Sequence, residues 1–253
     1  MLPTFIGLDL AWSSRNRSGG AVIRAGQLVA ATGLLRGDEE VLAFVADHLP
    51  APGAAVVAVD APLCVPNDTG RRRCDGEVSH AWGKYEAGAY PANRQRLAVE
   101  GVVRGEVLAA ALAARHGFVQ TAPLPQRGEG RYLCEVFPHP AHVALFQLPR
   151  TLKYKRKPGR DNACLNGEME RYQQLLEGLA QADPSLVDLE ALTGRDASAL
   201  RGQARKELED ALDAVTCAYV AYFAWWHGPE RQQVYGSIAE GHILTPLPPP
   251  PQT

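Results

Sequence analysis

The chain begins with three short strand-like runs whose connections are too short to hold a helix, and this opening restricts the folds it can adopt. The first run, 4–11, alternates in hydrophobicity and is followed by a turn-rich stretch at 13–20. Two further apolar runs, 20–24 and 27–35, are separated only by Ala25-Gly26. Consecutive strands with such tight connections pair as antiparallel neighbours. The sequence therefore predicts a three-stranded antiparallel meander at the start of the chain.

After the meander the pattern changes to an alternation of helices and strands. A helix is predicted over 38–48, and an unbroken apolar run at 54–59 is typical of a strand buried on both faces. A second helix is predicted over about 96–116, followed by a strand at 132–137 that Pro138 ends. This order is that of an α/β domain whose mixed sheet combines the antiparallel meander with parallel strands and is flanked by helices.

The remaining segments differ in character. Residues from about 64 to 95 are rich in Gly, Pro, Arg and aromatics without a clear period, so we predict a long irregular insertion. A basic loop at about 150–160 precedes a helix near 168–180, and the clearest helix of the chain spans 205–226. The proline-rich tail, about 246–253, suits neither a helix nor a central strand and is predicted to be loose.

Composition limits the classes of protein that fit. The chain has 253 residues, no internal repeat and no evident boundary, so residues 1–253 are predicted to form a single domain. The net charge of -2 excludes a globally basic protein, so any nucleic-acid contact must come from local basic patches. There is no signal peptide and no apolar run of about 18 residues. Five irregularly spaced cysteines without a CxxC pair indicate reduced thiols. We therefore expect a cytoplasmic protein without membrane contact.

Three acidic residues stand in or at the end of apolar strands. Asp9 lies inside the first strand, Asp60 directly follows the most hydrophobic strand, and Glu135 lies inside the last predicted strand. A buried carboxylate without a partner is costly, whereas carboxylates that share a hard divalent cation are neutralised by it. Each acid taken alone could instead cap a turn or pair with an arginine. Three acids at comparable strand positions favour a shared site.

The late helix adds further acids. Asp210 and Asp213 are three residues apart and share one face, and beyond Asp213 the helix is apolar almost all round. Interaction with the helix dipole accounts for Asp210 but not for Asp213, which is too deep and too apolar in its surroundings. We therefore predict catalytic carboxylates at Asp9, Asp60, Glu135 and Asp213, and a set of ligands for Mg²⁺ or Mn²⁺ at Asp9, Asp60, Glu135, Asp210 and Asp213.

Basic and aromatic residues gather in the insertion and in the basic loop. In the insertion three consecutive arginines precede aromatic residues, a combination suited to distorted or single-stranded nucleic acid. The basic loop contains no acid. A solvated surface is the ordinary alternative for both runs. We predict contacts to nucleic acid from Arg71, Arg72, Arg73, Trp82, Tyr85, Lys153, Lys155, Arg156 and Arg160.

Other motifs are weaker. His139 and His142 have a metal-like spacing, but two prolines and the lack of a third ligand argue against zinc. Cys134 has no evident histidine partner and is more typical of a core residue than of a nucleophile. Neither a Walker A motif nor GxGxxG is present, so no nucleotide cofactor is predicted.

Several motifs together carry a resemblance to a known family. They are FIGLDLAW, VVAVDAPL, RRRCD, CEVFPHPA, KYKRKPG, LEDALDAVTCAYVA and EGHILTP, and they extend from Phe5 to Pro246. Through them the chain resembles the DUF429 family, described as predicted ribonuclease-H-like nucleases, and its Asp-x-x-Asp-Ala helix is similar to that of the Holliday-junction resolvase branch. The resemblance implies a ribonuclease-H-like fold in which Asp9 and Asp60 are the strand carboxylates of a nuclease site and Asp213 is the helix carboxylate.

The predicted function is divalent-metal-dependent hydrolysis of phosphodiester bonds in DNA or RNA, through an acidic site that holds two cations about 3.5–4 Å apart. One alternative is a non-catalytic nucleic-acid-binding or regulatory module on the same fold. A second is a phosphotransferase of the actin or sugar-kinase type, which normally needs a duplicated domain that this chain lacks.

Overall fold

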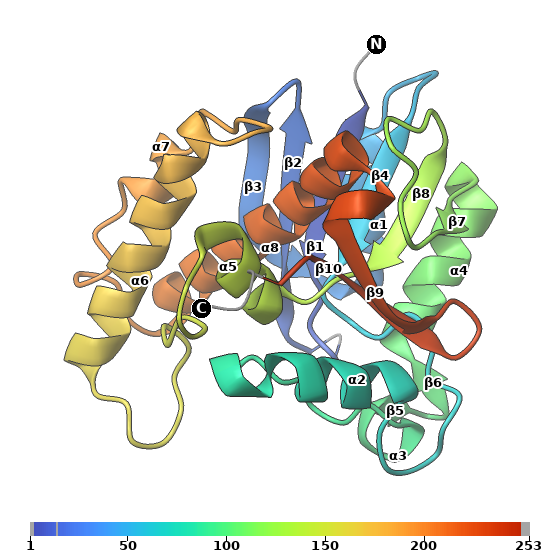
Figure 1. Cartoon of the computed structure of the whole chain (residues 1–253), viewed down its shortest axis with the longest axis horizontal. Helices are drawn as coiled ribbons and strands as arrows, with labels where there is room; N and C mark the ends of the chain where they lie inside the picture. The colour runs from blue at the N-terminus through green and yellow to red at the C-terminus, as the bar shows by residue number, and fades with distance from the viewer. Residues whose placement is uncertain (1–2, 14, 249–253) are drawn as a thin grey trace.

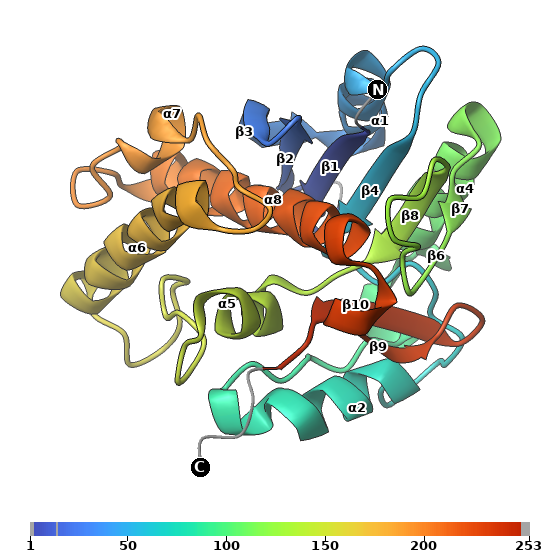
Figure 2. The ribbon, with the colours of Figure 1, turned by 45° about the horizontal axis from the view of Figure 1, so that its top comes forward.

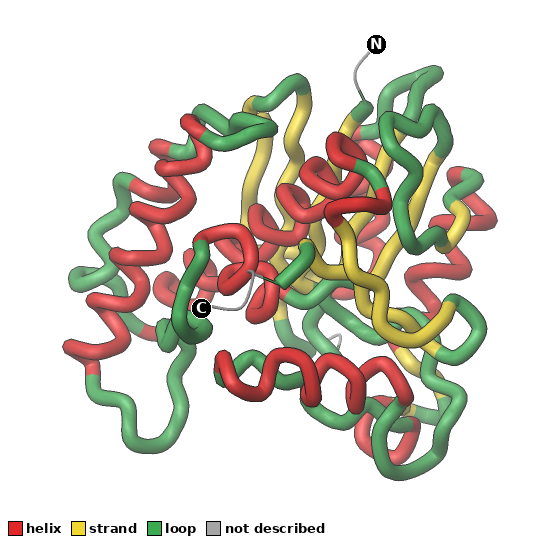
Figure 3. Tube along the Cα trace, in the orientation of Figure 1, coloured by secondary structure: helices red, strands yellow, loops and turns green. Residues whose placement is uncertain are grey.

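The computed structural model describes residues 3–13 and 15–248, with one six-stranded mixed sheet at its centre (Figures 1 and 3). The strand order is β3-β2-β1-β4-β8-β7. The first three strands form the predicted antiparallel meander, and the other three continue the sheet from β1 as parallel neighbours. The strands are β1 (Thr4–Asp9), β2 (Arg17–Arg24), β3 (Gln27–Arg36), β4 (Ala55–Val59), β8 (Arg131–Glu135) and β7 (Val119–Gln120).

Helices cover both faces of the sheet (Figure 2). On one face α8 (Gly202–His227) packs with α5 (Pro138–Phe146) and α6 (Asn162–Glu177). On the other face lie α1 (Gly37–His48) and α4 (Arg104–His116). The predicted fold class, a mixed α/β sheet flanked by helices, is thus confirmed, and the arrangement is compatible with a ribonuclease-H-like fold. No helix within residues 3–13 and 15–248 is long and apolar enough to cross a membrane.

Helix α8 lies unusually close to the sheet because the strands beneath it carry glycine where they cross it. A Cβ atom on Gly7 of β1 would lie 2.0 Å from the carbonyl oxygen of Ala214, and one on Gly19 of β2 would lie 2.0 Å from that of Asp210. A Cβ atom on Gly33 of β3 would lie 2.1 Å from the carbonyl oxygen of Glu207. Real Cβ atoms do not approach a backbone oxygen this closely. The absence of these side chains therefore fixes the depth at which α8 lies.

The insertion at 64–95 is more ordered than predicted, because it contains α2 (Arg73–Trp82) and the short α3 (Arg94–Leu97). Cys74, Val78 and Trp82 are four residues apart and are all buried. This period was present in the sequence, but arginines and glycine around it obscured the apolar stripe. Figure 1 shows α2 against a hairpin of two late strands, and the two elements share a small hydrophobic core.

That hairpin, β9 (Gln232–Ser237) and β10 (Gly241–Pro246), was not predicted. Its strands follow the long helix at the end of the chain, where no further strand was expected, and Pro246 of the predicted loose tail is the last residue of β10. Residues 247 and 248 follow without regular structure, and 249–253 lie outside the described residues.

Two predicted helix boundaries were also wrong. The helix expected from 96 begins only at Arg104, because a small hairpin of β5 (Ala98–Val99) and β6 (Val102–Val103) precedes it. The helix expected near 168 begins at Asn162, where the side chain of Asp161 caps its first turn. The short α7 (Glu190–Thr193) and 3₁₀ turns at Gly83–Tyr85, Gly178–Gln181 and Pro229–Arg231 complete the structure.

The close contact of α8 predicts that Gly7→Ala will lower the free energy of unfolding by about 3 kcal/mol or more, because the methyl group forces the helix away from β1. The matched control is Gly167→Ala, on the exposed side of α6 with no atom within 4 Å of the added carbon, which should stabilise by up to about 1 kcal/mol. Chemical denaturation of both variants measures the difference. Equal stabilities would show that α8 is free to shift on the sheet.

Candidate acidic site

Asp9 and Asp60 lie side by side at the carboxyl ends of two parallel strands. Leu8 of β1 pairs with Val59 of β4, so the two aspartates occupy the next matching position. The backbone N–H of Asp60 donates to the carbonyl of Leu8 at 2.8 Å and extends the pairing to this point. Side chains alternate between the faces of a strand. Since Gly7 faces α8, Asp9 and its neighbour Asp60 face α8 as well.

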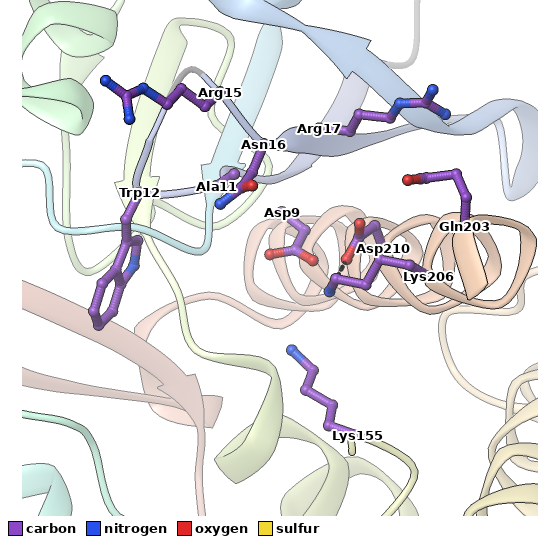
Figure 4. A pocket seen from close by; sticks show the side chains of 10 residues that line it. All are labelled: Asp9, Ala11, Trp12, Arg15, Asn16, Arg17, Lys155, Gln203, Lys206 and Asp210. Carbon is purple, nitrogen blue, oxygen red and sulfur yellow. Dashed lines mark hydrogen bonds and ion pairs between the residues drawn. The ribbon is translucent and has the colours of Figure 1, made fainter. Parts of the chain in front are cut away.

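Helix α8 brings two more carboxylates to the same place. Gly19, which pairs with Asp9 across β1 and β2, lies directly under the backbone of Asp210. The carboxyl groups of Asp9 and Asp210 lie within hydrogen-bonding reach of each other. Figure 4 shows these two side chains directed toward one another, with Lys206 bound to Asp210. Asp213, almost one turn further along, is fully buried.

Lys155, from the basic loop, projects into this cluster from the opposite side (Figure 4). Its Nζ lies 2.7 Å from Oδ2 of Asp213. Burial alone would lower the pKa of Lys155, but the negative charges of Asp213, Asp9 and Asp60 outweigh burial and raise the pKa well above its usual range. Burial likewise acts to raise the pKa of Asp213, but Lys155 and further polar contacts lower it overall. Lys155 and Asp213 therefore form a stable ion pair.

The other three aspartates show the opposite shift. Removal from solvent raises the pKa of Asp9, and it raises the pKa of Asp60 further because the charge of Asp9 adds to it. Burial and the charge of Asp9 together raise the pKa of Asp210 to about 8, although Lys206 opposes the change. Oδ2 of Asp210 is buried and, among the described residues, receives no hydrogen bond. Two carboxyl groups that face one another in this way need either a shared proton or a cation between them.

The fit of this cluster to a divalent metal is partial. Within the described part of the chain, no group of three or more His, Cys, Asp or Glu side chains is arranged to hold a metal ion. The five predicted ligands do not converge as one cage, since Asp213 is engaged by Lys155 and Glu135 by Arg72. The facing carboxylates of Asp9 and Asp210 remain suitable, because Mg²⁺ is commonly held by only one or two carboxylates, together with water and substrate phosphates.

Glu135 borders the same small groove as Asp60 but has its own set of partners. Val59 pairs with Glu135 across β4 and β8, so Glu135 and Asp60 are one position apart in register. Its carboxylate receives two bonds from Arg72, of 2.7 and 2.9 Å, and a third from the backbone N–H of Leu63. Arg72 also binds Asp75 at 2.8 Å. This buried ion-pair network occupies the carboxylate that was predicted to bind metal.

Several predicted nucleic-acid contacts have structural roles instead. Arg72 is only 3% exposed, and Trp82 is completely buried with its indole N–H donating to the hydroxyl of Tyr235. The guanidinium of Arg72 is engaged by Glu135 and Asp75, and Trp82 is enclosed, so both side chains have internal partners in the structure. Tyr85 is half-buried against Trp82. Arg71 and Arg73 are exposed, with Arg73 paired to Glu77.

The basic loop is held to the rest of the protein by its charges. Lys153 pairs with Glu86. Arg160 donates to the carbonyl oxygens of Lys153 and Lys155, at 3.3 and 2.8 Å. Arg156 is exposed and lines a pocket of about 300 Å³ together with residues at the start of α8. Of the four predicted residues in this loop, Lys155 is the one that enters the acidic cluster.

The acidic cluster opens into a pocket of about 540 Å³. Its walls combine acidic and basic side chains with one exposed aromatic ring (Figure 4). The loop directly after β1 supplies several of these residues, and their position next to Asp9 in the sequence could have indicated them. The lining residues missed from the sequence are Trp12, Arg15, Asn16, Arg17, Gln203 and Lys206.

The weaker sequence candidates belong to the core. Burial lowers the pKa of His142 to about 4, and its ring packs against Tyr172. His139 contacts the hydroxyl of Thr151 at 3.0 Å. Burial raises the pKa of the Cys134 thiol to about 12, which keeps it protonated. None of the three has the setting of a zinc ligand or a nucleophile.

Comparison with known proteins gives one match. A family model described as "Protein of unknown function (DUF429)" matches residues 7–237. The chain belongs to the DUF429 family. No curated protein and no solved structure matches it. The matched region of this DUF429 protein contains all four aspartates and Lys155.

The Arg72 network predicts a clear difference between adjacent arginines in this DUF429 protein. Arg72→Met leaves the buried carboxylates of Glu135 and Asp75 without their cation, so the free energy of unfolding should fall by about 3–5 kcal/mol. Arg71→Met, at an exposed site, should change it by less than about 0.5 kcal/mol. Thermal and urea unfolding of the two variants give the comparison. If Arg72→Met is as stable as wild type but binds nucleic acid more weakly, Arg72 contacts the substrate and has no structural role.

The Asp9–Asp210 pair predicts a pH-dependent stability in the presence of a chelator. The unfolded chain releases the Asp210 proton near pH 4, whereas the folded protein holds it to about pH 8. The pair therefore stabilises the protein at low pH, and this stability is lost as pH rises between those values. Across this window the free energy of unfolding of Asp210→Asn should rise, relative to that of wild type, by up to about 1.4 kcal/mol per pH unit.

The matched control for this measurement is Asp47→Asn, which removes the same charge from an exposed position on α1. Its unfolding free energy should follow wild type at every pH. Parallel curves for wild type and Asp210→Asn would mean that the two carboxyl groups do not share a proton.

Proposed function

We propose that this protein hydrolyses phosphodiester bonds of nucleic acid with the help of a divalent metal ion. The observation that carries the proposal is the composition of one pocket, in which the carboxylates of Asp9 and Asp210 lie together with the basic side chains of Lys155 and Lys206. Phosphodiester hydrolysis needs acidic groups to hold a cation and basic groups to bind the phosphate.

In this proposal Asp9 and Asp210 would hold the metal ion. When bound, such an ion supplies positive charge at the phosphate and lowers the pKa of a water molecule. Asp60 lies beside Asp9, and among the described residues no side chain forms an ion pair with it. Its carboxylate borders a second, smaller groove that also contains Trp12. In this proposal Asp60 accepts a proton from water at the edge of the pocket.

The chemical step can be written with these residues. The oxygen of water forms a bond to phosphorus while the bond from phosphorus to the 3′ oxygen breaks. The proton lost by the water passes to the carboxylate of Asp60, and the 3′ oxygen takes a proton from solvent. Lys155 and Lys206 bind the phosphate oxygens, whose negative charge they offset throughout the step.

The surroundings of the pocket favour an extended, single-stranded substrate. Trp12 is 45% exposed and stands where the main pocket meets the smaller groove, so its ring offers a stacking surface for a base. The pocket that contains Arg156 shares Lys206 with the main pocket and adds Arg201 and Arg205. These basic residues continue the path of a polyanion away from the carboxylates.

The test is a cleavage assay with labelled single strands, duplexes, RNA–DNA hybrids and four-way junctions in Mn²⁺. Asp9→Asn should lower the rate by at least about 100-fold while substrate binding persists. Asp47→Asn, which removes an equal charge far from the pocket, should cleave as wild type does. Trp12→Ala should weaken binding of single strands by about 1–3 kcal/mol.

Two outcomes would count against the proposal. Tight binding of nucleic acid without cleavage of any substrate in the panel would indicate a binding module on this fold. Cleavage that is equally fast in wild type and Asp9→Asn would identify a contaminating nuclease, because the proposed site would then contribute nothing.

A further inference from the structure

Three arginines line the pocket of about 300 Å³ at the start of α8, next to the acidic cluster. They come from separate places in the chain: Arg156 from the basic loop, Arg201 from the position just before α8, and Arg205 from the first turn of that helix. We call this site the arginine pocket. Its three guanidinium groups meet only because the basic loop folds back against the start of α8.

Each guanidinium group in the arginine pocket is held by neutral oxygen atoms. Arg156 donates to the side-chain oxygen of Asn162 at 2.7 Å. Arg201 donates to the backbone carbonyl of the preceding residue at 2.7 Å, and Arg205 to that of Leu165 at 2.9 Å. Among the described residues, none of the three arginines forms an ion pair with a carboxylate. These hydrogen bonds orient the guanidinium groups and leave their charges uncompensated, with further N–H donors free to bind a ligand.

The three positive charges act on one another. Burial, together with the charges of Arg156 and Arg201, lowers the pKa of Arg205, although the charge of Glu209 opposes this change. Glu209 is the one carboxylate among the described residues that line the pocket, and Lys206 binds it at 2.7 Å. Like charges that lie together in this way are stabilised when an anion binds between them.

The start of α8 adds to the positive charge. Within the described part of the chain, the first turn of this 26-residue helix contains no acidic residue, and no side chain caps it. The unpaired backbone N–H groups at the beginning of a helix carry a partial positive charge and favour an anion. The helix therefore reinforces the field that the three oriented arginines supply.

The amount of positive charge favours the phosphate at the end of a strand over a phosphate within it. Guanidinium groups bind the oxygens of phosphate in a bidentate manner. A phosphodiester carries a single negative charge, whereas a phosphate monoester carries about −1.5 to −2 charges near pH 7 and offers three acceptor oxygens. Three arginines without a carboxylate partner match the monoester more closely.

The arginine pocket adjoins the acidic cluster along α8. Lys206 lines both this pocket and the pocket of the acidic cluster. Arg201 and Arg205 precede Asp210 by nine and five residues, which corresponds to about 14 and 8 Å along the helix axis. Stacked nucleotides rise by about 3.4 Å each, so these distances equal about two to four nucleotides. One strand can therefore reach both pockets.

We propose that the arginine pocket binds the terminal phosphate of a nucleic-acid strand and thereby directs the protein to strand ends. This inference rests on the proposed function, which makes nucleic acid the substrate. Arg156, Arg201 and Arg205 bind the phosphate oxygens and take no part in the cleavage of a bond.

The test compares the affinities of single strands of one sequence that differ only in their ends. One strand has hydroxyl groups at both ends, the second a 5′ phosphate and the third a 3′ phosphate, and each carries an internal fluorophore for anisotropy. A chelator prevents cleavage during the measurement. Titration calorimetry with inorganic phosphate measures binding of the free anion.

The variants are Arg156→Met and Arg201→Met, singly and together, since both side chains are exposed and their loss leaves the core unchanged. Arg115→Met is the matched control, because it removes the same charge from an exposed position on α4, across the sheet. Thermal unfolding verifies that each variant is folded.

Wild type and Arg115→Met are expected to bind one of the two phosphorylated strands at least about tenfold more tightly than the hydroxyl strand. The double variant should bind all three strands equally. Equal affinities in wild type, or no binding of any strand, would overturn the inference, as would a preference that persists in the folded double variant. Binding of inorganic phosphate without a preference among the strands would also overturn it, because the ligand would then be a free anion.

Failure of the inference and failure of the proposed function are separable. A preference for a phosphorylated end, lost in the double variant, without cleavage in Mn²⁺ would support the arginine pocket and reject the nuclease activity. Cleavage that requires Asp9, by a protein that binds all three strands equally, would support the nuclease and reject the arginine pocket.

Discussion

Helix α8 lies directly on the meander because the three strands carry glycine at the points where the helix crosses them. Gly7 and Gly19 leave room for the backbone of α8, and a carbon atom added at either position would overlap a carbonyl oxygen of the helix. This contact carries Asp210 to the end of β1, where Asp9 stands. A helix one side-chain layer further out would separate the two carboxyl groups. The acidic cluster therefore depends on the missing side chains as much as on the acids themselves.

The charges at this end of the sheet are arranged in two groups. Asp9, Asp60, Asp210 and Asp213 gather on the α8 side and receive the ammonium groups of Lys155 and Lys206. Glu135 is bound by Arg72, in a separate network that joins α2 to β8. The first group borders a pocket of about 540 Å³, and the second borders only a smaller groove of about 60 Å³, which Asp60 also lines. The two groups differ chiefly in their partners, because Glu135 is bound by a buried arginine whereas Asp9 and Asp60 form no ion pair among the described residues.

Much of the fold could be predicted from local pattern. The three N-terminal strands, the buried run of β4 and helix α8 have clear periods, since each buries a face that the sequence marks with apolar residues. Helix α2 could have been found from Cys74, Val78 and Trp82, but polar residues between them diluted the signal. The late hairpin could not be found in this way, because its strands are stabilised by contacts with α2, far away in the sequence.

For the site, the sequence by itself determined which acids stand at strand ends and on the late helix, because a carboxylate in an apolar run is visible without a structure. Only the tertiary structure decided which of them meet. Strand register and the alternation of side chains put Asp60 beside Asp9, and a one-residue offset separated Glu135 from both. Long-range packing buries Arg72 and Trp82, which the sequence predicted as contacts to nucleic acid. It also places Lys155 among the aspartates. Such outcomes depend on contacts between residues distant in the chain, which a local pattern does not encode.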